Sequence, residues 1–71
     1  MNKHNLTALL REIRLEADLT QLQLAERLGH AQSYVSKYET GEQRLDLTEL
    51  HAICTVVGVS LVKFVERACE A

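Results

Sequence analysis

Apolar residues recur at intervals of three and four along nearly the whole chain, and this spacing is what most restricts its fold. The first set, near the N-terminus, is Leu6, Leu10, Ile13 and Ala17. Residues spaced in this way lie on one face of an α-helix, whereas a half-buried strand needs strict alternation, which no segment shows convincingly. Proline, which interrupts helices, is absent from the sequence. We therefore predict an all-α fold.

Capping residues divide the chain into five predicted helices. A side-chain oxygen just before a helix accepts a hydrogen bond from a free backbone N–H, and glycine readily adopts the left-handed conformation that ends a helix. Gln23 and Glu49 each lie three residues after a capping residue, which is the spacing of a capping box. The predicted starts are Asn2 or Asn5, Thr20, Ala31, Asp46 and Ser60; the predicted ends are Ala17, Gly29, Gly41, Gly58 and Ala68 or beyond.

The composition is that of one soluble globular domain. The chain has 71 residues, of which 46% are hydrophobic and 25% charged, and we expect residues 1–71 to form a single domain. No apolar run approaches the ~20 residues of a membrane span, and the first five residues do not resemble a secretory signal. Cys54 and Cys69 are too few for a disulfide framework. We expect a cytoplasmic protein that does not associate with membranes.

The region between Thr20 and Tyr38 has the spacing of a helix-turn-helix. Two helices that cross steeply need a small residue at the crossing, here Ala25, and a residue that tolerates positive φ in the turn, here Gly29. Val35 and Tyr38 supply the apolar side chains that hold the second helix against the first. Each feature is weak alone, but the complete set after a capped start at Thr20 strongly indicates this motif.

These residues resemble the Cro/repressor (XRE-type) helix-turn-helix family, over about residues 6–65. The similarity implies a five-helix, lambda-repressor-like DNA-binding domain in which helices 2 and 3 form the helix-turn-helix. Arg44-Leu45-Asp46 lacks the proline that many members carry there, and Leu22 replaces a residue that is usually polar. The segments that carry the resemblance are Leu19-Thr20-Gln21, Leu24-Ala25, Leu28-Gly29, the run from Gln32 to Glu39, Gly41-Glu42, Leu50 and Gly58-Val59-Ser60.

The resemblance implies that the helix over residues 31–40 lies in the DNA major groove. The residues opposite Val35 and Tyr38 are Gln32, Ser33, Ser36 and Lys37. A glutamine such as Gln32 can bind adenine bidentately, Lys37 can donate to guanine or phosphate, and the two serines can reach a base edge or phosphate.

Further contacts with DNA are implied outside this helix. Gln21 corresponds to a family glutamine that binds phosphate together with the helix N-terminus, and Arg44 is a second expected phosphate anchor. For Tyr34, contact with the DNA backbone and partial solvation remain equal alternatives. Arg14 and Glu39 correspond to a family ion pair, for which we expect a structural role rather than contact with DNA.

The apolar residues of the last two predicted helices bear on whether two copies of the chain form a dimer. The stripes expected to be buried are Leu47, Leu50, Ile53, Cys54 and Val57 in the fourth helix and Leu61, Phe64, Val65 and Ala68 in the fifth. A second apolar surface, assigned to Val56, Val62, Val65 and Cys69, would be exposed in a monomer. It indicates either a twofold dimer or a short helix that covers a small core on two sides. We favour the dimer, which would recognise a palindromic site.

We predict a sequence-specific transcriptional regulator, most simply a repressor that acts as a homodimer on double-stranded DNA. The alternative is an antitoxin-like or anti-regulator module that binds a protein partner, suggested by the net charge of −2 and the surplus leucines Leu9, Leu15 and Leu22. We expect no catalysis, metal or cofactor. His51 and Cys54 have the spacing of two metal ligands, but a zinc site needs three or four.

Overall fold

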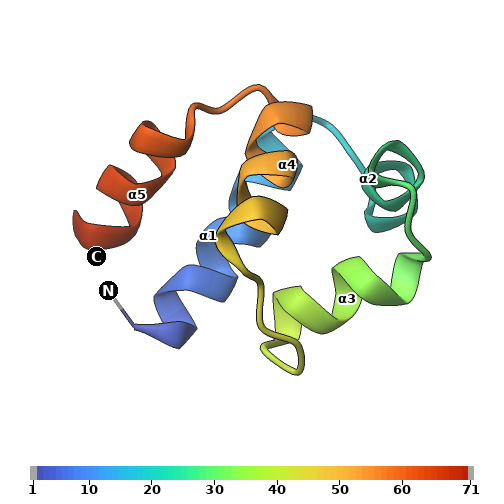
Figure 1. Cartoon of the computed structure of the whole chain (residues 1–71), viewed down its shortest axis with the longest axis horizontal. Coiled ribbons are helices and arrows are strands. Elements are labelled where there is room, and N and C mark those ends of the chain that lie inside the picture. Colours follow the sequence, from blue (N-terminus) through green and yellow to red (C-terminus); the bar gives the residue numbers. More distant parts are fainter. Residues whose placement is uncertain (1, 71) are drawn as a thin grey trace.

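The computed structural model describes residues 2–70, which form five helices and no strand (Figure 1). This confirms the predicted all-α class. The helices are α1 (Lys3–Glu16), α2 (Gln21–Leu28), α3 (Gln32–Thr40), α4 (Leu47–Val57) and α5 (Leu61–Glu70). α1 packs against α3 and α5, and α4 packs against α2 and α5. The start of α1 and the end of α5 lie on the same side of the molecule (Figure 1).

Side-chain caps begin four of the helices at the expected residues. Asn2, rather than Asn5, caps α1, because its side chain accepts a hydrogen bond from the Asn5 backbone N–H at 2.9 Å. Both predicted capping boxes are present, with reciprocal bonds at the start of α2 and of α4. The Ser60 hydroxyl accepts from the Lys63 N–H at 3.0 Å and so caps α5. α3 begins after Ala31 without a side-chain cap.

The core lies where all five helices converge. Ile13, Leu24, Ala25, Val35, Ile53 and Cys54 are completely buried, and Tyr38 and Phe64 are 1% exposed. Ala25, expected at the crossing of α2 and α3, and Val35, expected to hold α3 against α2, are both completely buried, and the two helices pack against each other. α5 contributes Phe64 and Ala68 to this core, and so covers the side formed by α1 and α4.

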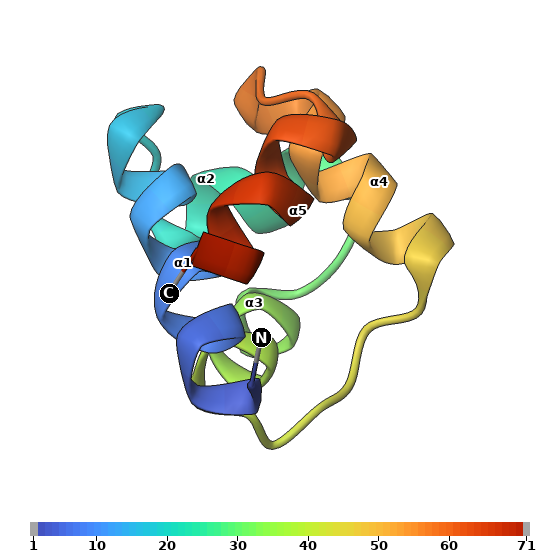
Figure 2. The same ribbon diagram turned by 90° about the vertical axis from the view of Figure 1, so that its left-hand side faces the viewer.

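Two residues predicted to be buried are exposed. Leu47 is 67% exposed, although Ile53 on the same helix is completely buried. The buried residues of α4 are Ile53 and Cys54 in its middle, whereas its first turn lies at the edge of the molecule (Figure 2). Val65 is 40% exposed because α5 turns Phe64 and Ala68 toward the core, and the next position after Phe64 lies about 100° around the helix. Val65 therefore belongs to the outer face of α5 and not to the core stripe.

Candidate nucleic-acid interface

A short left-handed turn sets the relative orientation of α2 and α3. Gly29 ends α2 with φ 75°, and the next backbone N–H, that of His30, donates to the Ala25 carbonyl at 2.9 Å. A side chain at Gly29 would find open space, so it is the positive φ that favours glycine there. Figure 1 views α2 nearly end-on while α3 lies across the page, and the two helices therefore cross steeply.

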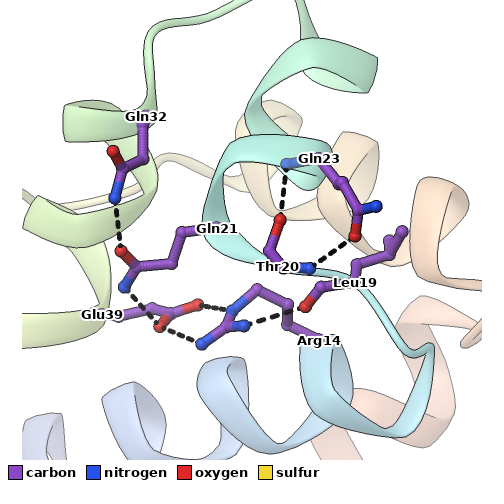
Figure 3. A network of polar contacts seen from close by, with 7 residues as sticks. All are labelled: Arg14, Leu19, Thr20, Gln21, Gln23, Gln32 and Glu39. Carbon is purple, nitrogen blue, oxygen red and sulfur yellow. Dashed lines mark hydrogen bonds and ion pairs between the residues drawn. The ribbon is translucent and has the colours of Figure 1, made fainter.

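A buried ion pair connects α1 to α3. The Arg14 guanidinium donates from Nε to Glu39 Oε2 at 2.7 Å and from Nη2 to Glu39 Oε1 at 3.1 Å (Figure 3). A third bond runs from Arg14 Nη1 to the Leu19 carbonyl at 2.9 Å. The two side chains are only 8% and 4% exposed. The pair therefore holds the last turn of α3 against α1 and the loop that precedes α2.

Glu39 also orients a row of two glutamines that leads to the protein surface. Gln21 Nε2 donates to Glu39 Oε1 at 3.2 Å, and Gln32 Nε2 donates to Gln21 Oε1 at 3.1 Å. A carboxylate only accepts hydrogen bonds, so Gln21 must turn its NH₂ group toward Glu39 and its oxygen toward Gln32. Gln32 in turn must direct its NH₂ group to Gln21. Figure 3 shows this row running from Arg14 to Gln32.

The order of donors in this row determines what Gln32 presents to a ligand. One N–H of its amide is used by Gln21, while the second N–H and the whole of Oε1 remain unpaired among the described residues. Gln32 is exposed and lies in the first turn of α3. It therefore offers one donor and one acceptor side by side, in a fixed order.

The other predicted contact residues on α3 differ in exposure. Ser33 and Lys37 are exposed and Ser36 is half-buried. They share one side of α3 with Gln32, since their positions differ by one, four and five residues. Val35 and Tyr38 occupy the buried side of the helix. The predicted division of α3 into an outward and an inward face is thus present.

Tyr34 is half-buried and tied to α4. Its hydroxyl donates to Glu49 Oε2 at 2.9 Å, and its ring stacks on His30 with centroids 3.9 Å apart. Burial, followed by the hydrogen bond to the Glu49 carboxylate, raises the pKa of Tyr34 to about 12. His30 and Glu49 were not among the predicted site residues. Glu49 was recognised only as a capping residue, and no local spacing reveals its partner fifteen positions away.

Arg44 lies apart from the two glutamines. It is exposed in the loop that follows the last residue of α3, whereas Gln32 is the first residue of that helix. The Gln43 N–H donates to the Lys37 carbonyl at 3.2 Å and so folds this loop back onto the end of α3. The structure therefore brings Gln21 and Gln32 together and leaves Arg44 at the far side of the same helix.

The outer face of α5 carries three of the four residues assigned to a dimer surface. Val62 is 67% exposed, Val65 is 40% exposed, and Cys69 is also exposed. Their spacing of three and four residues places them in one stripe. Val56, the fourth, is half-buried on α4.

No group of three or more His, Cys, Asp or Glu side chains within residues 2–70 is arranged to hold a metal ion. His51 is exposed, and Cys54 is completely buried, which raises the pKa of its thiol. Within the same residues no single helix is long and apolar enough to cross a membrane; α4 and α5 reach that length and apolarity only together, and they meet at a bend of 104°.

Comparison with known proteins places this geometry in a family. Residues 10–64 match the family model described as "Helix-turn-helix". An XRE-family like protein from Pseudomonas syringae pv. tomato is 38% identical, with a TM-score of 0.88 over 96% of this chain and 83% of that one. The clp gene regulator ClgR from Corynebacterium glutamicum is 26% identical, with a TM-score of 0.85 over 96% of this chain and 87% of that one. No curated protein matches the sequence. The chain belongs to the XRE-type helix-turn-helix family.

Proposed function

We propose that this protein is a sequence-specific transcriptional regulator that binds double-stranded DNA with α3 in the major groove. The family membership supports DNA binding, and one solved relative is described as a gene regulator. The observation that carries the proposal is the fixed order of donor and acceptor on Gln32. That order comes from Glu39 through Gln21, so the exposed amide is oriented before any DNA arrives.

Gln32 is suited to adenine. Adenine presents in the major groove an N6 amino donor beside the N7 acceptor. The unpaired Oε1 of Gln32 would accept from N6 while its second N–H donates to N7. Because Gln21 already holds the amide, little side-chain freedom is lost on binding. Ser33 and Ser36 are short enough to allow α3 to approach the base edges.

Phosphate contacts would flank this base contact. Gln21 keeps one N–H unpaired among the described residues and stands in the first turn of α2, whose helix N-terminus favours an anion. Lys37 would donate to guanine or phosphate, and Arg44 would bind phosphate at the far end of α3. The Tyr34 hydroxyl is bonded to Glu49, and the residue is half-buried, so only the accessible part of its side chain would contact the DNA backbone.

The regulator would act as a homodimer and a repressor in the cytoplasm. One module of this size makes few phosphate contacts and binds DNA weakly. The stripe of Val62, Val65 and Cys69 offers an apolar face of α5 that a second copy would cover. A twofold pair would place two α3 helices about one DNA turn apart on a palindromic site. Repression then follows from occupying a promoter.

The test is selection of bound duplexes from a random pool, followed by affinity measurements with Gln32→Ala. The variant should lose discrimination at one adenine position by about 1–3 kcal/mol, and its circular dichroism and melting should stay those of the wild type. Lys63→Ala, a change on the far helix α5, is the matched control and should bind like the wild type. Absence of any wild-type complex at low salt would refute the proposal.

A second candidate function is an interaction module for another protein. Leu15 and Leu22, each 53% exposed, are the observation in its favour, together with the net charge of −2. Leu9, the third leucine expected to be surplus, is instead part of the core at 7% exposure and does not support this function. This function predicts a stable complex with a protein partner and no selection of DNA sequence from the pool.

A further inference from the structure

A pocket of about 310 Å³ lies beside the end of α3, away from the two glutamines. Its walls come from the first two turns of α1, the last turn of α3 and the loop that follows. Figure 2 shows these three segments at the same end of the molecule. The volume is at the lower end of the usual range for small-molecule sites, about 300–1,000 Å³.

The lining of this pocket combines an apolar interior with positive charge. Leu6, Leu10 and Leu45 supply aliphatic surface, and none of the lining residues is acidic. Lys3 and Arg44 also line it. Both cations are exposed, and neither has an ion-pair partner among residues 2–70. Such a combination suits a molecule with an apolar body and a single negative charge.

Two further observations concern the wall and the rim of this pocket. Tyr38 forms part of the wall and is 1% exposed, and its hydroxyl is the one buried side-chain N or O atom without a hydrogen-bond partner among the described residues. A buried hydroxyl without a hydrogen-bond partner is unfavourable, so the hydrogen-bonding capacity of this wall is not satisfied within the protein. The Lys3 side chain passes over Gly41, where an added Cβ would meet Lys3 Cε at 2.9 Å. The close approach of this lysine to the loop places its charge at the rim.

We propose that this pocket binds a small amphipathic monocarboxylate and that its occupation weakens DNA binding. The carboxylate would pair with Lys3 and Arg44 at the rim, and the aliphatic body would lie on Leu6, Leu10 and Leu45. The second half of the proposal rests on the proposed function, because Arg44 is there a phosphate anchor. A carboxylate that pairs with Arg44 competes with DNA phosphate for the same guanidinium.

Octanoate is the probe, and its binding is measured first without DNA, by calorimetry and by NMR of the leucine and valine methyl groups. Saturable binding in the millimolar range or tighter, with methyl shifts centred on Leu10 and Leu45, is expected. Octylammonium, which has the same chain and the opposite charge, should not bind. Lys3→Gln should weaken octanoate binding about two- to fivefold, the scale of one exposed ion pair, whereas Lys63→Gln on α5 should leave it unchanged.

Thr7→Phe, which places a ring in the pocket from α1, should abolish octanoate binding in a chain that still melts cooperatively. Equal binding of octylammonium and octanoate, shifts confined to the exposed Leu15, Leu22 and Val62, or no saturation at all would each overturn the proposed site.

The effect on DNA is measured with the duplex selected by the wild-type chain. Saturating octanoate should weaken DNA binding about fivefold or more, and by reciprocity DNA should weaken octanoate binding by the same factor. Unchanged DNA affinity would overturn the regulatory half of the proposal. Octanoate binding by a chain that selects no DNA would support the pocket and refute the proposed function, so the two failures are distinguishable.

Discussion

Gln21 accepts a hydrogen bond from Gln32 across the helix-turn-helix at 3.1 Å, and its own amide donates to the buried Glu39. The two glutamines are eleven residues apart in sequence and begin α2 and α3. Because Glu39 is itself held by Arg14, the orientation of an exposed side chain on α3 depends on an ion pair in the interior. Folding and recognition are therefore linked through one row of polar groups.

Loss of the interior ion pair should destabilise the whole domain. In Arg14→Met the Glu39 carboxylate would stay buried without its cation, which costs about 3–5 kcal/mol of unfolding free energy. For a domain of this length that corresponds to a fall in Tm of more than about 10 °C. Arg67→Met is the control, because Arg67 pairs with Glu12 and Glu16 at the surface and should shift Tm far less. An unchanged Tm in Arg14→Met would show that the pair is not structural.

Tyr34 should make the fold sensitive to alkali. Burial and Glu49 raise its pKa from 10.0 to about 12, and burial raises the pKa of Tyr38 as well. Above pH 10 the unfolded chain therefore binds fewer protons than the folded one. The free energy of unfolding keeps the full contribution of the protonated tyrosines below pH 10 and loses it as the pH rises toward 12.

A titration of tyrosinate absorbance should show both tyrosines ionising late and together with unfolding. In Tyr34→Phe the remaining tyrosine should still titrate late. Ionisation of one tyrosine near pH 10 in a chain that stays folded would contradict the burial and the bond to Glu49.

Charge on the outer face of α5 should prevent dimerisation. Val62→Glu places a carboxylate within the proposed interface, where its desolvation is unfavourable. Sedimentation at micromolar concentration should give twice the 8.0 kDa chain mass for the wild type and the single mass for the variant. Leu47→Glu is a matched control, since Leu47 is equally exposed, at 67%, but lies on α4. A wild-type chain that sediments as a monomer would contradict the dimer.

The local parts of this fold could be predicted and the long-range ones could not. The capping boxes of Thr20 with Gln23 and of Asp46 with Glu49 depend on residues three apart, so the sequence alone reveals them. The buried faces of Val35 and Tyr38 follow from helical spacing. The exposure of Leu47 depends instead on where the core ends along α4, and spacing says nothing about that position.

The candidate site shows the same limit. The sequence placed Gln21 and Gln32 in one interface through the family resemblance, but it did not predict that they bond to each other. The hydrogen bond of Tyr34 to Glu49 was also missed, because it joins the helix-turn-helix to α4, a helix outside the motif. Such contacts depend on how α4 packs and not on a repeat within any helix.

The most direct test of the account is a double-mutant cycle on DNA affinity with Gln21→Ala and Gln32→Ala, measured on the duplex selected by the wild-type chain. The double variant should lose less than the sum of the single losses, with a coupling of about 0.5–3 kcal/mol. Gln32→Ala with Arg44→Ala, at opposite ends of α3, should be additive and serves as the reference pair. Additive losses for Gln21 and Gln32 would contradict the claim that one glutamine orients the other for recognition.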